Sequence, residues 1–276
     1  MMNPYELHQQ VEAIASMLDA QEQPEAYEYL TGLLFDTEEV TESPYEIATE
    51  LMKADSPAPL PAFLIDFITE LYEEEIEDGN ADAMNDLGAH YYDGWRGLEQ
   101  SFSKAVALYH RAAENGSRAA QENLGYCYYY GRDMERDYEK AFHYFALGAF
   151  DGHLISLYKI GDMYQNGYFV EKNPTEAFRI YDRCIGMMTD ADAPIVAGPV
   201  FLRLGNCFLY GNGVEENAKN AQLCFQQAER YLYDMVAGGD VMYKKSLQAA
   251  IDGQAKAREK LNEKLPDKQW LGGKRD

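Results

Sequence analysis

The hydrophobic and polar positions between residues 79 and 231 follow one pattern that recurs four times. In each copy a small or apolar residue is followed four positions later by Leu or Ile, and four positions after that by an aromatic residue. This spacing places all three on one stripe of a helix. A glycine directly follows the Leu or Ile. The glycines and the aromatics are, in order, Gly88, Gly125, Gly161 and Gly205, and Tyr91, Tyr128, Tyr164 and Phe208. A tolerated helix defect costs about 1 kcal/mol at each glycine, so four matched glycines favour close approach of another helix.

A second helix is predicted in each copy, where an alanine is followed four residues later by an aromatic. These pairs are Ala105 and Tyr109, Ala141 and Phe145, Ala177 and Tyr181, and Ala221 and Phe225. Four residues before each alanine stand Ser101, Asp137, Asn173 and Asn217. Side chains of these types accept hydrogen bonds from unpaired N–H groups in the first turn of a helix. The alanines are 36, 36 and 44 residues apart, a period that indicates stacked helix-turn-helix units.

The recurring residues resemble the Sel1-like repeat (SLR) family, which is related to tetratricopeptide repeats. The resemblance covers roughly 150 residues and is carried by Ala83, Leu87-Gly88, Tyr91, Gly94, Lys104-Ala105, Tyr109, Ala112-Ala113 and Gly116, and by their counterparts. It implies an all-α, right-handed α-α superhelix. The third copy departs at Cys184-Ile185 and Met188, the first has an extra loop residue near Trp95, and Gly-x-Gly-Val is intact only at 211–214.

The flanking segments are predicted to cap the two ends of the solenoid. Apolar spacing indicates helices at 4–19, from Pro24, from Pro44 and at 62–78, the last as the second helix of a degenerate repeat. The predicted organisation is therefore an N-terminal cap at 1–78, repeats at 79–115, 116–151, 152–196 and 197–231, and a C-terminal capping helix (240–265) with a tail within 232–276. The eight extra residues around 187–194 indicate either a lengthened helix plus loop or a local bend.

Charge is distributed unevenly along the chain. The net charge is −23, and residues 1–80 hold 20 acidic residues against Lys53 alone. Nucleic acid is excluded as an expected partner, because binding it requires clustered Lys and Arg. Either these carboxylates form a solvated, solubilising face, or they favour a basic protein partner.

Signals for chemistry or membranes are missing from the sequence. The four cysteines, Cys127, Cys184, Cys207 and Cys224, have no metal-ligand spacing and are expected to be reduced, packed thiols. The five histidines do not pair with Cys or carboxylates at metal-site spacing, and no nucleophile motif is present. No cofactor, metal or catalytic residue is predicted. The N-terminus lacks a secretion signal and no apolar run nears the roughly 18–20 residues of a membrane helix, so a cytoplasmic protein without a membrane partner is expected.

A partner is expected on the first helices, which by the resemblance line the concave wall of the solenoid. A stripe beside the core stripe supplies the candidate partner-binding residues Asn85, Tyr92, Glu122, Tyr126, Tyr129, Tyr158 and Asp162. Tyrosine suits recognition because it offers a large rigid surface and one hydroxyl. Either these rings form an aromatic groove with acidic edges, or they pack on neighbouring helices.

The predicted function is a non-catalytic module that binds a peptide or protein surface on the concave face. Fold analogy carries much of this prediction. The alternative is an immunity or antidote-type inhibitor whose acidic N-terminal third masks a basic toxin or effector, which the resemblance to bacterial SLR proteins suggests. Strong dependence on salt would favour the alternative.

Overall fold

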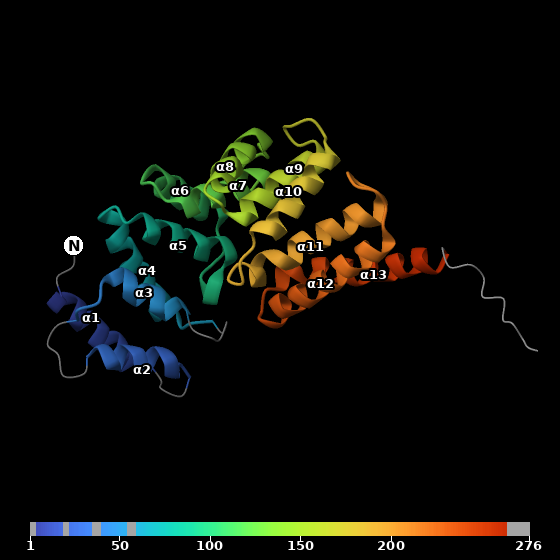
Figure 1. Ribbon diagram of the computed structural model, residues 1–276. Helices are drawn as coiled ribbons and strands as arrows, with labels where there is room; N and C mark the ends of the chain where they lie inside the picture. The colour runs from blue at the N-terminus through green and yellow to red at the C-terminus, as the bar shows by residue number, and fades with distance from the viewer. Residues whose placement is uncertain (1–3, 19–21, 35–39, 54–58, 264–276) are drawn as a thin grey trace, which may run out of the picture. The chain divides into compact units, whose positions relative to one another are not determined.

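The computed structural model describes residues 4–18, 22–34, 40–53 and 59–263. Within these ranges the chain forms thirteen α-helices and no strand, which confirms the all-α prediction (Figure 1). The helices form two compact units, Met1–Tyr144 and Phe145–Asp276, and the boundary falls inside α8. The predicted domain boundaries and the handedness of the superhelix stay predictions.

The helices of the first unit include four that precede the repeats. These are α1 (Pro4–Met17), α2 (Pro24–Leu33), α3 (Pro44–Lys53) and α4 (Ala62–Glu77). The repeats begin with α5 (Ala81–Asp93), the 3-10 turn η1 (Trp95–Gly97), α6 (Phe102–Glu114), α7 (Arg118–Tyr130) and α8 (Tyr138–Phe150). The helix starts predicted from Pro24 and Pro44 are confirmed, and the one predicted from residue 4 begins at Pro4. Consecutive helices from α3 to α7 pack on one another.

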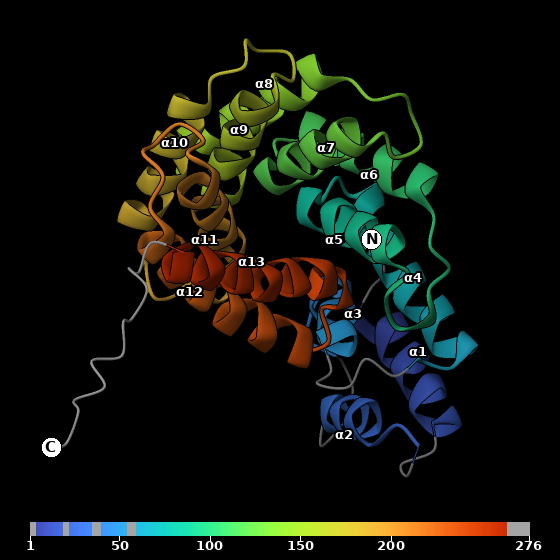
Figure 2. The same cartoon turned by 90° about the vertical axis from the view of Figure 1, so that its right-hand side faces the viewer.

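The second unit continues the same alternation of first and second helices. It contains α9 (Leu154–Asn166), α10 (Pro174–Met187), α11 (Ala193–Tyr210), α12 (Ala218–Ala237), η2 (Val241–Tyr243) and α13 (Lys244–Glu263). The helices α12 and α13 lie side by side in both views (Figure 2). The core holds Cys184 and Cys207, and the four cysteines are free thiols, three of them buried.

The turn inside each repeat is built the same way four times. Every first helix ends at a glycine in the left-handed region, with φ between 68° and 75°. The N–H of the next capping residue donates to the carbonyl of the core aromatic over 2.8–3.0 Å, as from Ser101 to Tyr91. The predicted caps are confirmed: the side chains of Ser101, Asp137, Asn173 and Asn217 each accept from a backbone N–H three residues on.

The aligned glycine permits close packing of the two helices in a repeat. A Cβ added at Gly161 would lie 2.6 Å from Cε1 of Tyr181. The same atom at Gly205 would lie 2.7 Å from the ring of Phe225, closer than real Cβ contacts. The packing interpretation of these glycines is therefore confirmed.

The longer turn of the first repeat is hydrogen-bonded to the end of α3 through Arg96 and Trp95. The guanidinium of Arg96 is buried and donates from Nη1 to the carbonyl of Leu51 over 2.6 Å, and Nε1 of Trp95 donates to Met52 over 3.1 Å. Both acceptors lie in the last turn of α3, whose carbonyls lack partners within the helix. The backbone of Arg96 is strained in this contact, because its φ of 51° lies in the left-handed region.

The turn before the C-terminal helix, and the packing of that helix, resemble those of the repeats more than its sequence indicates. The turn at Gly239 (φ 103°) repeats the hydrogen bonds of the turn at Gly116. Gly253 of α13 then packs on the face of Phe225, where a Cβ would lie 2.6 Å from the ring. The helix predicted at 240–265 is observed at Lys244–Glu263 after a 3-10 turn. The predicted tail lies outside the described residues.

The insertion between the third and fourth repeats lengthens a helix. Helix α11 begins twelve residues before Gly205, whereas α9 begins seven before Gly161. Leu232 of α12 packs at Gly198, which directly follows the five added residues. The lengthened-helix alternative is therefore the one observed.

Candidate functional site

Three of the predicted partner-binding residues meet in one aromatic cluster of the first unit. Tyr126 and Tyr129 lie half-buried on α7, and both contact Tyr130, with ring centroids 6.2 and 4.9 Å away. Tyr92 lies half-buried on α5, 5.1 Å from the ring of Phe102. These rings therefore pack on other aromatic side chains and keep part of their surface exposed, while the aromatic groove with acidic edges stays a prediction.

Arg132 joins the two halves of this aromatic cluster. Its Nε donates to the hydroxyl of Tyr92 over 3.3 Å, and its Cζ lies 4.7 Å from the centroid of Phe102 and 5.8 Å from that of Tyr130. A guanidinium over aromatic faces is held by their quadrupoles. Burial raises the pKa of Tyr92, and the hydrogen bond and charge of Arg132 oppose that shift. The cluster thus spans the first and second repeats.

The remaining first-unit candidates lie on the same two helices. Asn85 is half-buried on α5, and its Oδ1 accepts from Nδ2 of Asn123 over 3.0 Å. This amide pair links α5 to α7. Glu122 is half-buried on α7.

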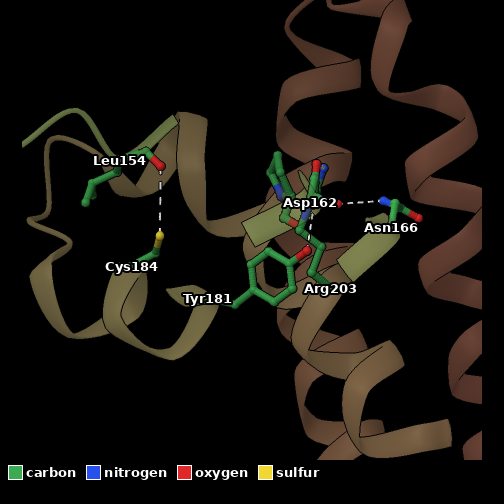
Figure 3. A network of polar contacts seen from close by, with 7 residues as sticks. Leu154, Asp162, Asn166, Tyr181, Cys184 and Arg203 are labelled. Atoms are coloured by element: carbon green, nitrogen blue, oxygen red, sulfur yellow. Dashed lines mark hydrogen bonds and ion pairs between the residues drawn. The ribbon is translucent and has the colours of Figure 1, made fainter. Parts of the chain in front are cut away.

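The second-unit candidates differ from the sequence-based expectation, because Tyr158 and Asp162 are buried, at 4% and 8% exposure. The carboxylate of Asp162 accepts from Nε and Nη2 of Arg203 over 2.5 and 2.6 Å, and from the hydroxyl of Tyr181 over 2.8 Å (Figure 3). Arg203 also lies over the ring of Tyr158, 4.6 Å from its centroid. Asp162 is therefore not an exposed acidic edge: it is the centre of a link between α9, α10 and α11.

Electrostatics keep Asp162 and the half-buried Arg203 ionised. Burial alone raises the pKa of the Asp162 carboxyl, but the charge and hydrogen bonds of Arg203 outweigh burial and hold that pKa below its usual value. The pKa of Arg203 is raised well above its usual value by Asp162, against its own desolvation. Burial and the neighbouring carboxylate raise the pKa of Tyr181, so its hydroxyl stays a donor.

A cleft that the sequence did not indicate opens along α3. It has a volume of about 570 Å³ and is lined by Tyr29, Glu42, Tyr45, Glu46, Thr49, Glu50 and Lys53. A smaller cavity of about 130 Å³ shares Thr49 and Lys53 with it and continues to Tyr72, Asp86, Ala89 and His90. Burial lowers the pKa of His90 to about 4, so its imidazole is neutral at pH 7.

Sequence spacing missed Arg132 and Arg203, which organise the two clusters. Both stand outside the stripe from which the candidates were taken: Arg132 follows the turn glycine, and Arg203 lies two residues before Gly205. The signal for Arg203 was its charge, opposite to that of Asp162 in the preceding repeat. Nothing in the spacing alone marks Arg132.

The Sel1 repeat family model matches residues 81–117, 118–153, 154–183 and 202–230. Each range lies on one of the four helix pairs that share the glycine, cap and turn geometry described above. The chain contains four Sel1 repeats.

Curated relatives match less than half of this chain. The chain is 34% identical over 109 residues to the ERAD-associated E3 ubiquitin-protein ligase component HRD3B of Arabidopsis thaliana, a match that covers 39% of this chain and 17% of the relative. It is 34% identical over 120 residues to Protein sel-1 homolog 2 of Homo sapiens, covering 44% of this chain and 17% of the relative. The match thus spans about a sixth of the length of these two relatives.

A solved structure shows the same fold. The Sel1 repeat protein from Oxalobacter formigenes superimposes with a TM-score of 0.53 at 21% identity, covering 84% of this chain and 97% of that one. The all-α repeat fold implied by the sequence is therefore also the fold of this solved Sel1 repeat protein.

Helix α11 corrects the expectation that no apolar run is long enough to cross a membrane. Among the described helices it alone is long and apolar enough, over Ala193–Tyr210, to cross a membrane by length and composition, and half of that window is buried inside the protein. Core helices pass the same test. In this protein α11 packs against α12 and α13, and that packing gives its apolar side chains a place in the core.

Proposed function

We propose that this chain is a non-catalytic protein-interaction module that holds a peptide or protein surface against the first helices of its repeats. Its Sel1 repeats support this proposal, as does the name of one relative, which describes a component of a larger ligase. Because the match spans a small part of that relative, no ligase partner is transferred to this chain.

The observation that carries the proposal is the aromatic cluster around Arg132. Tyr92, Tyr126 and Tyr129 belong to the first helices of two successive repeats and are half-buried. Rings that already pack on one another lose little conformational entropy when a partner covers them. Such pre-ordered tyrosines are typical of binding surfaces.

The test removes two rings of the cluster. The double substitution Tyr126→Ala/Tyr129→Ala is expected to abolish capture of the native partner, identified by pull-down and mass spectrometry, while helicity by circular dichroism is unchanged. The matched control is Tyr27→Ala/Tyr233→Ala, which removes two exposed tyrosines outside the cluster and should leave capture intact. Unaltered capture by the cluster variant, or equal loss in the control, rejects the proposed surface.

The α3 cleft favours the second candidate, an immunity or antidote-type inhibitor whose acidic N-terminal third masks a basic toxin or effector. Carboxylates from Glu42, Glu46 and Glu50 line it. In that case affinity should fall steeply with added salt, because exposed charges are screened within about 10 Å at 0.1 M. A complex indifferent to salt excludes this second candidate.

A further inference from the structure

The α3 cleft opens along the side of α3 opposite its buried residues, and Tyr29 of α2 also lines it. Ile47, Ala48, Leu51 and Met52 bury one side of α3 in the core. The opposite side carries Tyr45, Glu46, Thr49, Glu50 and Lys53, and all of these line the cleft. The volume of about 570 Å³ lies within the range of binding clefts.

Hydrogen bonds inside the protein orient Glu42 and Glu46 of the cleft, and Asp86 of the smaller cavity that continues it. The hydroxyl of Tyr29 donates to Glu42, and that of Tyr45 donates to Oδ2 of Asp86 over 2.8 Å. Glu46 accepts from the backbone N–H of Ser43 over 2.8 Å. These donors fix the carboxylates without neutralising them.

Within the described chain the cleft keeps an excess of negative charge. Lys53 is its only cation, and its Nζ lies 3.1 Å from Glu50. Glu42, Glu46 and Asp86 have no Lys or Arg partner among the described residues. A positively charged occupant is therefore favoured over a neutral or anionic one.

Another site in the protein shows which cation binds a carboxylate that already accepts a hydrogen bond from a tyrosine. At the buried link, Tyr181 donates to Asp162 over 2.8 Å, and Arg203 binds the same carboxylate with two N–H groups while lying over Tyr158. Tyr45 donates to Asp86 over the same distance. No arginine of the described chain completes the Tyr45–Asp86 pair.

We infer that the α3 cleft binds an arginine side chain of a partner protein. Its guanidinium would bind the carboxylate of Glu42 in the cleft and that of Asp86 in the adjoining cavity, and it would lie against the rings of Tyr29 and Tyr45. Arginine suits the cleft better than lysine because its planar fork of donors matches carboxylates and stacks on aromatic faces. The inference rests on the part of the proposed function that says the chain binds a protein, not on the aromatic cluster as the binding surface, and it adds the chemistry of the partner.

The test uses a fluorescein-labelled glycine–serine peptide with two arginines, together with versions that carry citrulline or lysine at both positions. Fluorescence anisotropy at low salt should show binding of the arginine peptide, at least tenfold weaker binding of the citrulline peptide, and intermediate affinity for the lysine peptide. No binding of the arginine peptide, or equal affinity for arginine and citrulline, overturns the inference. Equal affinity for lysine overturns the assignment to arginine.

Substitutions locate the site. Glu42→Gln/Asp86→Asn keeps acceptors for both tyrosine hydroxyls and should weaken the arginine peptide at least tenfold. Glu73→Gln/Glu77→Gln makes the same charge change at exposed positions of α4 and should change affinity less than twofold. Equal weakening by both variants would mean a diffuse charge effect and reject the site. Thermal melts of both variants check that they fold.

The captured partner separates this inference from the proposed function. If Tyr126→Ala/Tyr129→Ala abolishes capture and the cleft variant does not, the function stands and the cleft inference fails. If the cleft variant alone abolishes capture, the inference stands and the proposed surface fails.

Discussion

At the scale of single residues, the repeats depend on glycines, because a glycine leaves room for a side chain of the neighbouring helix. Gly161 leaves room for the ring of Tyr181, whose hydroxyl is tied to Asp162 over 2.8 Å. That hydrogen bond prevents the ring from swinging away from an added methyl group. Gly186, in the next helix, has nothing within 4 Å of the position its Cβ would take. Two helical glycines thus differ in what they do.

Alanine at these two glycines should therefore act in opposite directions. We expect Gly161→Ala to destabilise the native state by about 1–3 kcal/mol, the usual cost of overpacking. Gly186→Ala should stabilise it by up to about 1 kcal/mol, because alanine has the higher helix propensity. Urea denaturation followed by circular dichroism measures both. A Gly161→Ala variant as stable as the Gly186→Ala variant contradicts the packing account.

The glycines were predictable from the sequence because the residues that mark each repeat lie close together in the chain and recur four times. Caps, turn glycines and core aromatics lie within one repeat, so their spacing shows them. Asp162 was misplaced for the opposite reason. Its partner, Arg203, lies 41 residues away in the next repeat, and the spacing of one helix cannot show what the next repeat brings against it.

At the scale of helices, charged side chains link elements that apolar packing alone would join less specifically. Arg203 joins α11 to α9 through Asp162, and Arg96 joins the first repeat to the end of α3. Removing one member of a buried ion pair leaves the other charged and without a counterion. The Asp162–Arg203 link therefore allows a test by pH as well as by substitution.

Asp162→Asn should destabilise the protein by about 3 kcal/mol at pH 7. Because the folded-state pKa of Asp162 is below its usual value of about 3.9, the carboxylate stabilises the native state above that value. This contribution is lost as the pH falls through the folded-state pKa, so wild type and variant should converge in acid. Denaturation curves across pH measure the difference. The control Arg179→Gln breaks an exposed pair and should cost under about 0.5 kcal/mol; a constant difference down to low pH contradicts the assignment.

At the scale of the whole molecule, the sequence predicted the fold further than it predicted the site. Four copies of one pattern specify helix pairs and their turns, and the Sel1 repeat match and the solved structure agree with that. The clusters around Arg132 and along α3 arise where elements distant in sequence meet. Tyr45, for example, reaches Asp86 across 41 residues. Such meetings depend on packing between helices, which periodicity does not encode.

The most direct measurement of the central claim, that the first helices bind a protein, is hydroxyl-radical footprinting of the chain with and without its captured partner. Oxidation of Tyr92, Tyr126 and Tyr129 should be slowed by the partner, while that of the exposed Tyr233 on the second helix α12 stays unchanged. Slower oxidation of Tyr233 with the three cluster tyrosines unaffected would contradict the account.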